Sequence, residues 1–348
     1  MVAAKGLLSA LALAVAFLAA QGATRRPLGT GTVWAVGVVL GSSVLGALAY
    51  GTVLSGGLVA VRVAVVAGTI FFLLQFSSVR EAFTALVQAC GAVALVAAAT
   101  GLPSVSSGRL AGGVPPLSPN ELAMLAGIVV LYAGWRVLLE DAGWQLGVAG
   151  VAGLAVVWAT GSRTTLVMLL GALLVLALHI RRARVGLVVA GLLVGGLGVV
   201  AAVATGVFTA FLERDGTGVS TLESRFIAWE AAGSWAESAW QLVFGGGLSV
   251  KIIQVEGQWW NEQPLDSSWV SLLVQTGVLG VTAAGLWVLW VVRGSLRAPR
   301  EHRALFLALL VFLVGRSFVE SGLFDATPAF LTFVAISLLA EGRTRARL

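Results

Sequence analysis

The stretch LDSSWVSLLVQTGVLGVTAAGL (residues 265–286) contains a single carboxylate near its start, Asp266, and then continues without another charged residue. Apolar windows of this kind recur along nearly the whole chain, and each is long enough to cross a bilayer core about 30 Å thick. Because backbone polar groups must find partners inside lipid, we expect these windows to be helices. The sequence therefore predicts an all-α, polytopic integral membrane protein.

Composition supports the same class of protein. Of the 348 residues, 58% are hydrophobic and only 11% are charged, and the mean hydropathy is +0.97. A soluble domain has about 25% charged residues, which argues against an ordinary soluble protein. We expect a single membrane domain over residues 1–348 with about eleven membrane-spanning helices. The predicted spans are 6–22, 31–53, 57–75, 82–101, 119–138, 144–160, 164–180, 185–208, 267–292, 304–324 and 327–341.

The basic residues predict the orientation. When the spans alternate, one side receives Arg25, Arg26, Arg80, Arg136, Arg181, Arg182, Arg184, Arg293, Arg297, Arg300, Arg303, Arg343, Arg345 and Arg347. The opposite loops contain Lys5, Arg109, Arg163, Arg214, Arg225 and Lys251. The positive-inside rule then predicts a multi-pass protein of the plasma (inner) membrane with a cytoplasmic C-terminus and an outer N-terminus. This topology accounts for the pI of about 10.6, so nucleic acid is not an expected partner.

The first predicted span has an alternative interpretation as a signal peptide. The small residues AAQGA follow the apolar core of residues 1–22, as they do before a cleavage site. Cleavage would leave Arg25 and Arg26 on the outer side, against the charge bias. A retained first helix is therefore favoured.

Two predicted outer loops are long. Residues 102–118 are rich in Pro, Gly and Ser, and residues 209–266 form the most extended hydrophilic segment, which we expect to cap a cavity. The second loop includes LESRFIAWEAAGSWAESAW (222–240), whose acidic residues Glu223, Glu230 and Glu237 would share one face of a helix. An amphipathic helix edged with Trp suits the membrane interface. A lid helix without chemistry of its own is the alternative.

Charged residues inside or beside the spans are the candidates for function, because such charges are costly and usually face a cavity. Arg163 begins the seventh span, where the helix dipole already favours an anion. Arg316 and Glu320 are four residues apart and share a face of the tenth span. Arg62 lies about one turn inside the third span. Each also has a structural interpretation: Arg62 as a snorkelling residue, and Arg316 with Glu320 as an ion pair.

Together with Arg109 and Arg225 from the outer loops, these arginines would converge on the outer side, although Arg109 has solvation as its alternative. Arginine binds phosphate oxygens bidentately, so the pattern predicts a pocket for a polyanion such as a lipid-linked diphosphate. His179 and His302 lie at or beyond the opposite span ends. The sequence contains no P-loop or HExxH motif, and its outer acidic residues are sparse, so we expect neither a metal nor a cofactor. Cys90 is the only cysteine, which excludes an intramolecular disulfide.

Four segments, in order, resemble the O-antigen ligase and polymerase superfamily of membrane glycosyltransferases. They are RLAGGVPPLSPNELA (109–123), TGSRTTLVMLLGALLVLALHIRRAR (160–184), SRFIAWEAAGSWAESAWQLVFGGGLSV (224–250) and LDSSWVSLLVQTGVLGVTAAGL (265–286). The resemblance covers roughly residues 100–345. It implies an all-helical fold in which a large outer loop caps a cavity. It also implies transfer of a glycan from an undecaprenyl-diphosphate carrier without a nucleotide sugar or a metal.

The resemblance also assigns roles to residues. The family's arginines match Arg163 and Arg225, which would hold the diphosphate leaving group. The ligases have a histidine as acceptor-activating residue at the position of Asp266, and this chain departs from that pattern. Asp266 would act as the base here, with a helix N-cap as its alternative role. Gln263, Trp259 and Trp260 would contact sugar, although membrane anchoring suits the tryptophans equally.

The leading hypothesis is an enzyme that polymerises lipid-linked repeat units on the extracytoplasmic face. Its partners would be an undecaprenyl-diphosphate-linked glycan, an acceptor glycan or lipid, and membrane lipids. A ligase acting on a lipid or protein acceptor is the alternative within the same class. A flippase for lipid-linked sugars is the alternative from another class; inverted repeats or discontinuous helices would support it, and neither is detected in the sequence. A non-catalytic scaffold is the third alternative.

Overall fold

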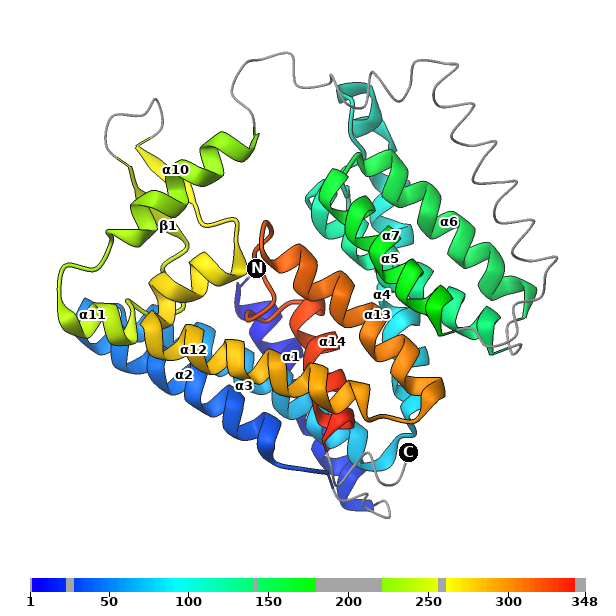
Figure 1. Cartoon of the computed structure of the whole chain (residues 1–348), viewed down its shortest axis with the longest axis horizontal. Coiled ribbons are helices and arrows are strands. Elements are labelled where there is room, and N and C mark those ends of the chain that lie inside the picture. The colour runs from blue at the N-terminus through cyan, green and yellow to red at the C-terminus, as the bar shows by residue number, and fades with distance from the viewer. Residues whose placement is uncertain (1, 23–27, 140–142, 180–220, 256–260, 342–348) are drawn as a thin grey trace.

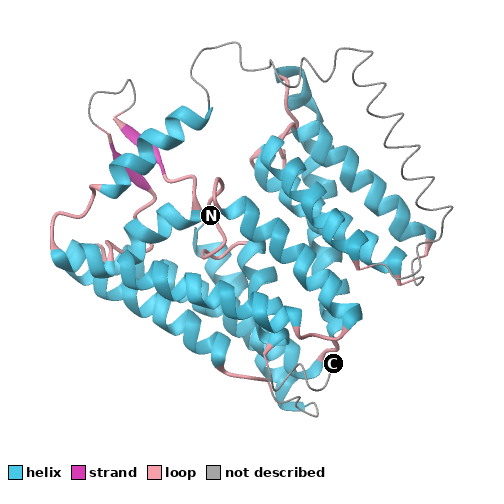
Figure 2. Cartoon of the chain, viewed as in Figure 1, coloured by secondary structure: helices cyan, strands magenta, loops and turns pink. Residues whose placement is uncertain are grey.

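The structure is a computed structural model that describes residues 2–22, 28–139, 143–179, 221–255 and 261–341 (Figure 1). Within these residues the chain is all-α, as predicted, apart from one short hairpin (Figure 2). The helices are α1 (Val2–Gly22), α2 (Gly31–Tyr50), α3 (Val53–Phe76), α4 (Val79–Gly101), η1 (Leu102–Ser107), α5 (Pro119–Leu138), α6 (Trp144–Thr160), α7 (Arg163–Leu178), α10 (Thr221–Gly233), α11 (Ala239–Phe244), α12 (Ser268–Leu296), α13 (Arg300–Ser317) and α14 (Pro328–Ala340). The hairpin pairs β1 (Ile252–Gln254) with β2 (Glu262–Pro264).

Helix α13 lies between two groups of helices (Figure 1). On one side, α4, α5, α6 and α7 pack on one another, and α13 contacts α5 and α7. On the other side, α12 packs on α2 and α14, while α1 and α2 pack on α3. Buried phenylalanines on α13 and α14, including Phe306, Phe312 and Phe333, fill the centre. The central position of α13 explains why a site at its end can draw residues from both groups.

Four of the described helices are long and apolar enough to cross a membrane, and a multi-pass arrangement is compatible with them. They are α2, α3, α12 and the continuous segment 79–107. The count of about eleven spans was wrong for the described residues, since α6, α7 and α14 are apolar but have only 17, 16 and 13 residues. The predicted span 185–208 lies outside the described residues.

Helix α5 illustrates why hydropathy overestimated the number of spans. All of its residues from Leu122 to Ala133 are buried inside the protein. Apolar residues are selected both by a protein core and by lipid, and hydropathy alone does not distinguish the two environments. Other helices do present large apolar side chains outward: Leu54 is 80% exposed and Trp34 is 73% exposed. Such an apolar outer surface is the kind that a membrane would cover.

Helix α12 is interrupted at Gly277, whose backbone has φ 64° and ψ −169°. The sequence had suggested a continuous span here, so the interruption corrects the prediction that discontinuous helices are absent. A break frees carbonyl groups that need other partners inside an apolar bundle. Those partners come from elsewhere in the chain: Gly246 N–H donates to Val274 O at 2.8 Å, and Gly247 N–H donates to Gln275 O at 2.9 Å.

A second correction concerns the predicted amphipathic helix 222–240. Helix α10 ends at Gly233, and Ser238 caps a new helix, α11, by accepting from the Gln241 N–H. Glu237 therefore does not share a helical face with Glu230. The chain then forms the β1–β2 hairpin, which the sequence analysis did not predict. In residues 102–118, which were predicted to form an outer loop, η1 provides a helical turn.

We predict that Gly277→Ala destabilises the protein by at least about 2 kcal/mol. The left-handed φ disfavours a side chain, and a Cβ there would lie 2.3 Å from the carbonyl of Val243. Gly285→Ala in the same helix is the matched control, because its Cβ would meet nothing within 4 Å. Thermal unfolding of the purified protein in detergent measures both. Equal melting temperatures for the two variants would contradict the prediction.

Candidate functional site

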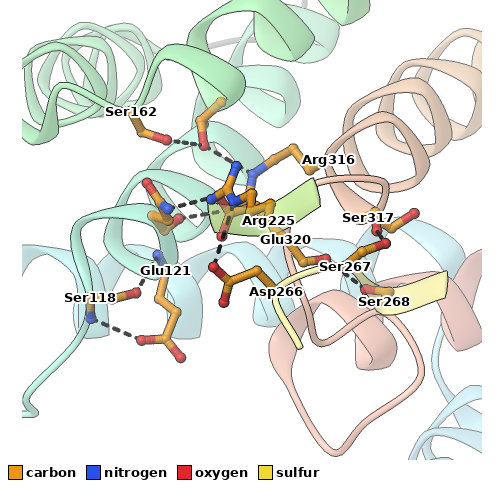
Figure 3. A network of polar contacts seen from close by, with 12 residues as sticks. Ser118, Glu121, Ser162, Arg225, Asp266, Ser267, Ser268, Arg316, Ser317 and Glu320 are labelled. Carbon is orange, nitrogen blue, oxygen red and sulfur yellow. Dashed lines mark hydrogen bonds and ion pairs between the residues drawn. The ribbon is translucent and has the colours of Figure 1, made fainter. Parts of the chain in front are cut away.

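The candidate site is a cluster of charged and polar side chains where several helix ends meet (Figure 3). The C-terminal end of α13 and the loop after it meet the N-terminal ends of α5, α7 and α12, and α10 contributes one arginine. Segments that are widely separated in the sequence thus contribute to one site. We call this set the polar cluster: Arg109, Asn120, Ser162, Thr165, Arg225, Asp266, Arg316 and Glu320.

Arg225 bridges two carboxylates in the polar cluster (Figure 3). Its Nη2 donates to Glu320 Oε1 at 3.3 Å, and its Nε lies 3.5 Å from Asp266 Oδ2. The side chains of Arg225 and Glu320 are only 15% and 17% exposed, whereas that of Asp266 is 44% exposed. Asp266 is therefore the acid that a ligand can reach, and its contact with Arg225 is long enough to be displaced.

An apolar cluster positions Arg225. Ala228 and Ala232, which follow Arg225 by three and seven residues on α10, are 2% and 5% exposed. They pack in a small core with Ile253 from the hairpin and Val274 from α12. Because residues at these spacings share a helical face, this packing directs Arg225 toward the end of α13. The hairpin thus contributes to the site by holding α10 in place.

Asn120 joins Arg109 to Glu320 within the polar cluster. Its Nδ2 donates to Glu320 Oε1 at 2.7 Å, and its Oδ1 accepts from Arg109 Nη2 at 3.1 Å. Asn120 is free for these contacts because Ser118 and Glu121 already cap α5 with a reciprocal capping box. Asn120 was not among the predicted site residues. The sequence pattern that could have identified it is the capping box of Ser118 and Glu121, which leaves the side chain of Asn120, in the first turn of α5, free to bond elsewhere.

Arg316 is a buried structural member of the cluster, and its guanidinium contacts Thr165 and Asn120 instead of forming the ion pair with Glu320 that was its alternative interpretation. It is 5% exposed, and its guanidinium donates from Nε to Thr165 Oγ1 at 3.0 Å and from Nη2 to the Asn120 carbonyl at 2.9 Å. Ser162 also donates to Thr165, at 2.9 Å. Arg316 thereby connects α13, α5 and α7, and these contacts fix the position of the C-terminal end of α13, which Glu320 follows.

Asp266 does not cap α12. The N-cap is Ser267, whose hydroxyl accepts from the Val270 N–H. Ser268 anchors the same turn by donating its hydroxyl to the Glu320 carbonyl at 2.8 Å. The cap role that had competed with a catalytic role for Asp266 is therefore filled by its neighbour, and the carboxylate stays available to partners from other segments.

Burial raises the pKa of Glu320 above its ordinary value. The charges of Arg316 and Arg225 and the hydrogen bond from Asn120 oppose this shift, and the nearby charge of Asp266 adds to it. A buried carboxyl with a raised pKa is a feature that functional sites use to hold and pass protons. The two acids of the polar cluster thus have different environments.

The other predicted site residues lie in different places. Arg109 joins the polar cluster and also donates from Nε to the Thr160 carbonyl at 2.9 Å. Arg163 is exposed at the first residue of α7, and the contacts described above involve its neighbours Ser162 and Thr165. Gln263 lies in β2 opposite Ile253. Trp259 and Trp260 lie outside the described residues.

Arg62 is not brought to the polar cluster. It is exposed on α3, which packs on α1, α2, α4 and α14, whereas the cluster is built from other helices. It is also deeper than expected: α3 begins at Val53, so Arg62 lies about 13 Å along the helix from its start. Among the described residues, no group of three or more His, Cys, Asp or Glu side chains is arranged to hold a metal ion.

No protein-family model matches the chain, and no curated protein matches it significantly.

We predict that Glu320→Gln gains melting temperature relative to the wild type as the pH rises. A carboxyl whose pKa is raised on folding binds more protons in the folded state, so wild-type stability falls as the pH rises above the ordinary glutamate value of 4.5. The glutamine keeps an acceptor for Asn120 and Arg225 but has no proton to lose. Thermal unfolding from pH 4.5 to 8 measures the difference, and a difference independent of pH would contradict the raised pKa.

Proposed function

We propose that this protein is a polymerase-like glycosyltransferase that extends a glycan from undecaprenyl-diphosphate-linked repeat units on the extracytoplasmic face of the plasma membrane. The observation that carries the proposal is the Arg225 bridge. It combines a cation suited to a diphosphate with an accessible carboxylate, Asp266, and a buried one, Glu320. The family resemblance adds support, because each of its four segments contributes residues to the polar cluster.

The position of the polar cluster agrees with an outer site. Helices α5 and α13 run antiparallel: Asn120 contacts Arg316 at one end, and Trp135 Nε1 donates to the Glu301 carbonyl at the other. The 18 residues of α13 span about 27 Å, close to the thickness of a hydrocarbon core. Arg136, Arg300 and Arg303 lie at the end away from the cluster. The positive-inside rule assigns that end to the cytoplasm and therefore the polar cluster to the outer side.

In this proposal the diphosphate of the donor binds at Arg225 and competes with Asp266 for its guanidinium. Phosphate oxygens form strong bidentate pairs with arginine, while the Arg225–Asp266 contact is 3.5 Å long and partly exposed. Binding of the donor therefore releases the Asp266 carboxylate. Glu320 stays bonded to Asn120 and keeps Arg225 aimed at the leaving group.

The released carboxylate would then act as the general base. The oxygen of an acceptor hydroxyl forms a bond to the anomeric carbon of the donor sugar, and the bond from that carbon to the diphosphate oxygen breaks. The hydroxyl proton passes to Asp266, and the electron pair leaves with undecaprenyl diphosphate. Arg225 stabilises the negative charge that develops on this leaving group. Neither a nucleotide sugar nor a metal is needed to balance the step.

A carboxylate in place of the ligases' histidine favours polymerisation over ligation to a lipid or protein acceptor. The interruption of α12 at Gly277 is the feature that favours a flippase, because transporters use broken helices to bind substrate. Here, however, the freed carbonyls accept hydrogen bonds from Gly246, Gly247 and the hydroxyl of Ser42. The break is therefore occupied by the protein itself, which argues for the transferase.

We predict that Arg225→Gln lowers the rate of chain extension at least about 100-fold, and that Asp266→Asn lowers it about 10²–10⁴-fold. The assay uses purified protein in proteoliposomes with undecaprenyl-diphosphate-linked repeat units and measures product length by gel electrophoresis. Arg293→Gln removes an exposed charge from the opposite end of α12 and is the matched control, with an unchanged rate.

If Asp266→Asn extends the glycan at the wild-type rate, Asp266 is excluded as the base. If the protein moves labelled lipid-linked units across the bilayer without extending a chain, the proposal of a transferase is wrong and that of a flippase is supported.

A further inference from the structure

A polar cavity of about 180 Å³ lies beside Asp266, and none of its lining residues belongs to α5 or α7. Three segments surround it: the ends of the β1–β2 hairpin, the first turns of α12, and the loop that follows α13. The polar side chains on its walls are Lys251, Asp266, Ser268, Ser271, Gln275, Ser321 and Asp325. Asp266 is the one member of the polar cluster that lines this cavity.

Hydrogen bonds to the protein hold several polar groups of this cavity in place, and acceptor atoms remain for a ligand. The hydroxyl of Ser271 donates to the Leu265 carbonyl at 2.8 Å, and the amide of Gln275 donates to the Val250 carbonyl at 2.8 Å. Lys251 is engaged with Asp325. The carboxylates of Asp266 and Asp325 and the hydroxyl oxygens supply acceptors, and the further N–H groups of Lys251 and Gln275 supply donors. Such a wall suits a ligand that brings several hydroxyl groups.

Size and shape limit that ligand to one ring. Sites for drug-sized ligands have volumes of about 300–1,000 Å³, so a cavity of 180 Å³ has no room for an extended chain. Phe324, Leu265 and Leu272 add apolar surface to its walls. A sugar ring combines an apolar face with a rim of hydroxyl groups, and this combination matches the lining.

We propose that this cavity binds one pyranose ring, the terminal sugar of the acceptor glycan; the inference rests on the glycan transfer proposed above. Asp266 belongs both to the cavity wall and to the Arg225 bridge. A ring in the cavity places a hydroxyl group beside this carboxylate, while the diphosphate binds at Arg225. The cavity thus supplies the nucleophile beside the carboxylate that takes up its proton.

The test uses Ser321, which lies exposed at the cavity. Because Cys90 is buried and is the only cysteine, Ser321→Cys introduces a single accessible thiol. Methyl glycosides of hexoses, N-acetylhexosamines and hexuronic acids are added singly to the purified protein in detergent, and maleimide labelling is timed. At least one class should slow the labelling of Ser321→Cys about tenfold or more. Ser106→Cys, exposed on η1, is the matched control and should label at the same rate with and without glycoside.

A filling variant provides the second measurement. Ser321→Trp should remove binding of the protective glycoside, observed by saturation-transfer NMR, while Ser321→Ala keeps it. In the chain-extension assay, Ser321→Trp should raise the KM for acceptor glycan about tenfold and leave the KM for donor unchanged.

The outcomes separate this inference from the proposed function. Chain extension by the wild type without glycoside protection at Ser321 would overturn the sugar cavity and leave the transferase intact. Protection that Ser321→Trp abolishes, in a protein that never extends a glycan, would support the cavity and overturn the transferase.

Discussion

The carboxylate of Glu320 receives hydrogen bonds from Asn120 and Arg225, and these two bonds tie the start of α5 and helix α10 to the loop after α13. An unpaired polar group in an apolar interior is costly, so each of these side chains requires the others. Arg316 meets the same requirement through Thr165 and the backbone of Asn120. The polar cluster is thus both the joint between segments and the candidate site.

The same constraint governs the interruption of α12. A left-handed glycine ends the first helical segment, and the carbonyls it frees would be unsatisfied without the turn at Gly246 and Gly247. The turn can approach so closely because it consists of glycines: a Cβ at Gly245 would lie 2.4 Å from the backbone of Gln275. This contact fixes the first turns of α12, and with them the place of Asp266 and the walls of the polar cavity.

The proposed chemistry follows from the different roles of the arginines in the polar cluster. Arg316 is too deeply buried to hold a substrate, and it keeps α5, α7 and α13 in register. Arg225 contacts the largely buried Glu320 and the more exposed Asp266. In the proposed mechanism an incoming anion replaces Asp266 as a partner of Arg225, while the contact between Arg225 and Glu320 stays. A site built in this way is pre-organised, which is what electrostatic stabilisation of a leaving group requires. The polar cavity extends the same site toward an acceptor.

The sequence by itself determined the helical class and the identity of most charged residues in the site, because hydropathy and the cost of buried charge are local properties. Only the tertiary structure decided that Arg225, Asp266 and Glu320 meet, that Arg316 is structural, that Asn120 links the cluster and that Arg62 lies apart. These outcomes depend on which helices pack together and where a glycine interrupts one of them. Such long-range contacts leave no periodic signal, and the same absence of a signal explains why core helices were counted as membrane spans.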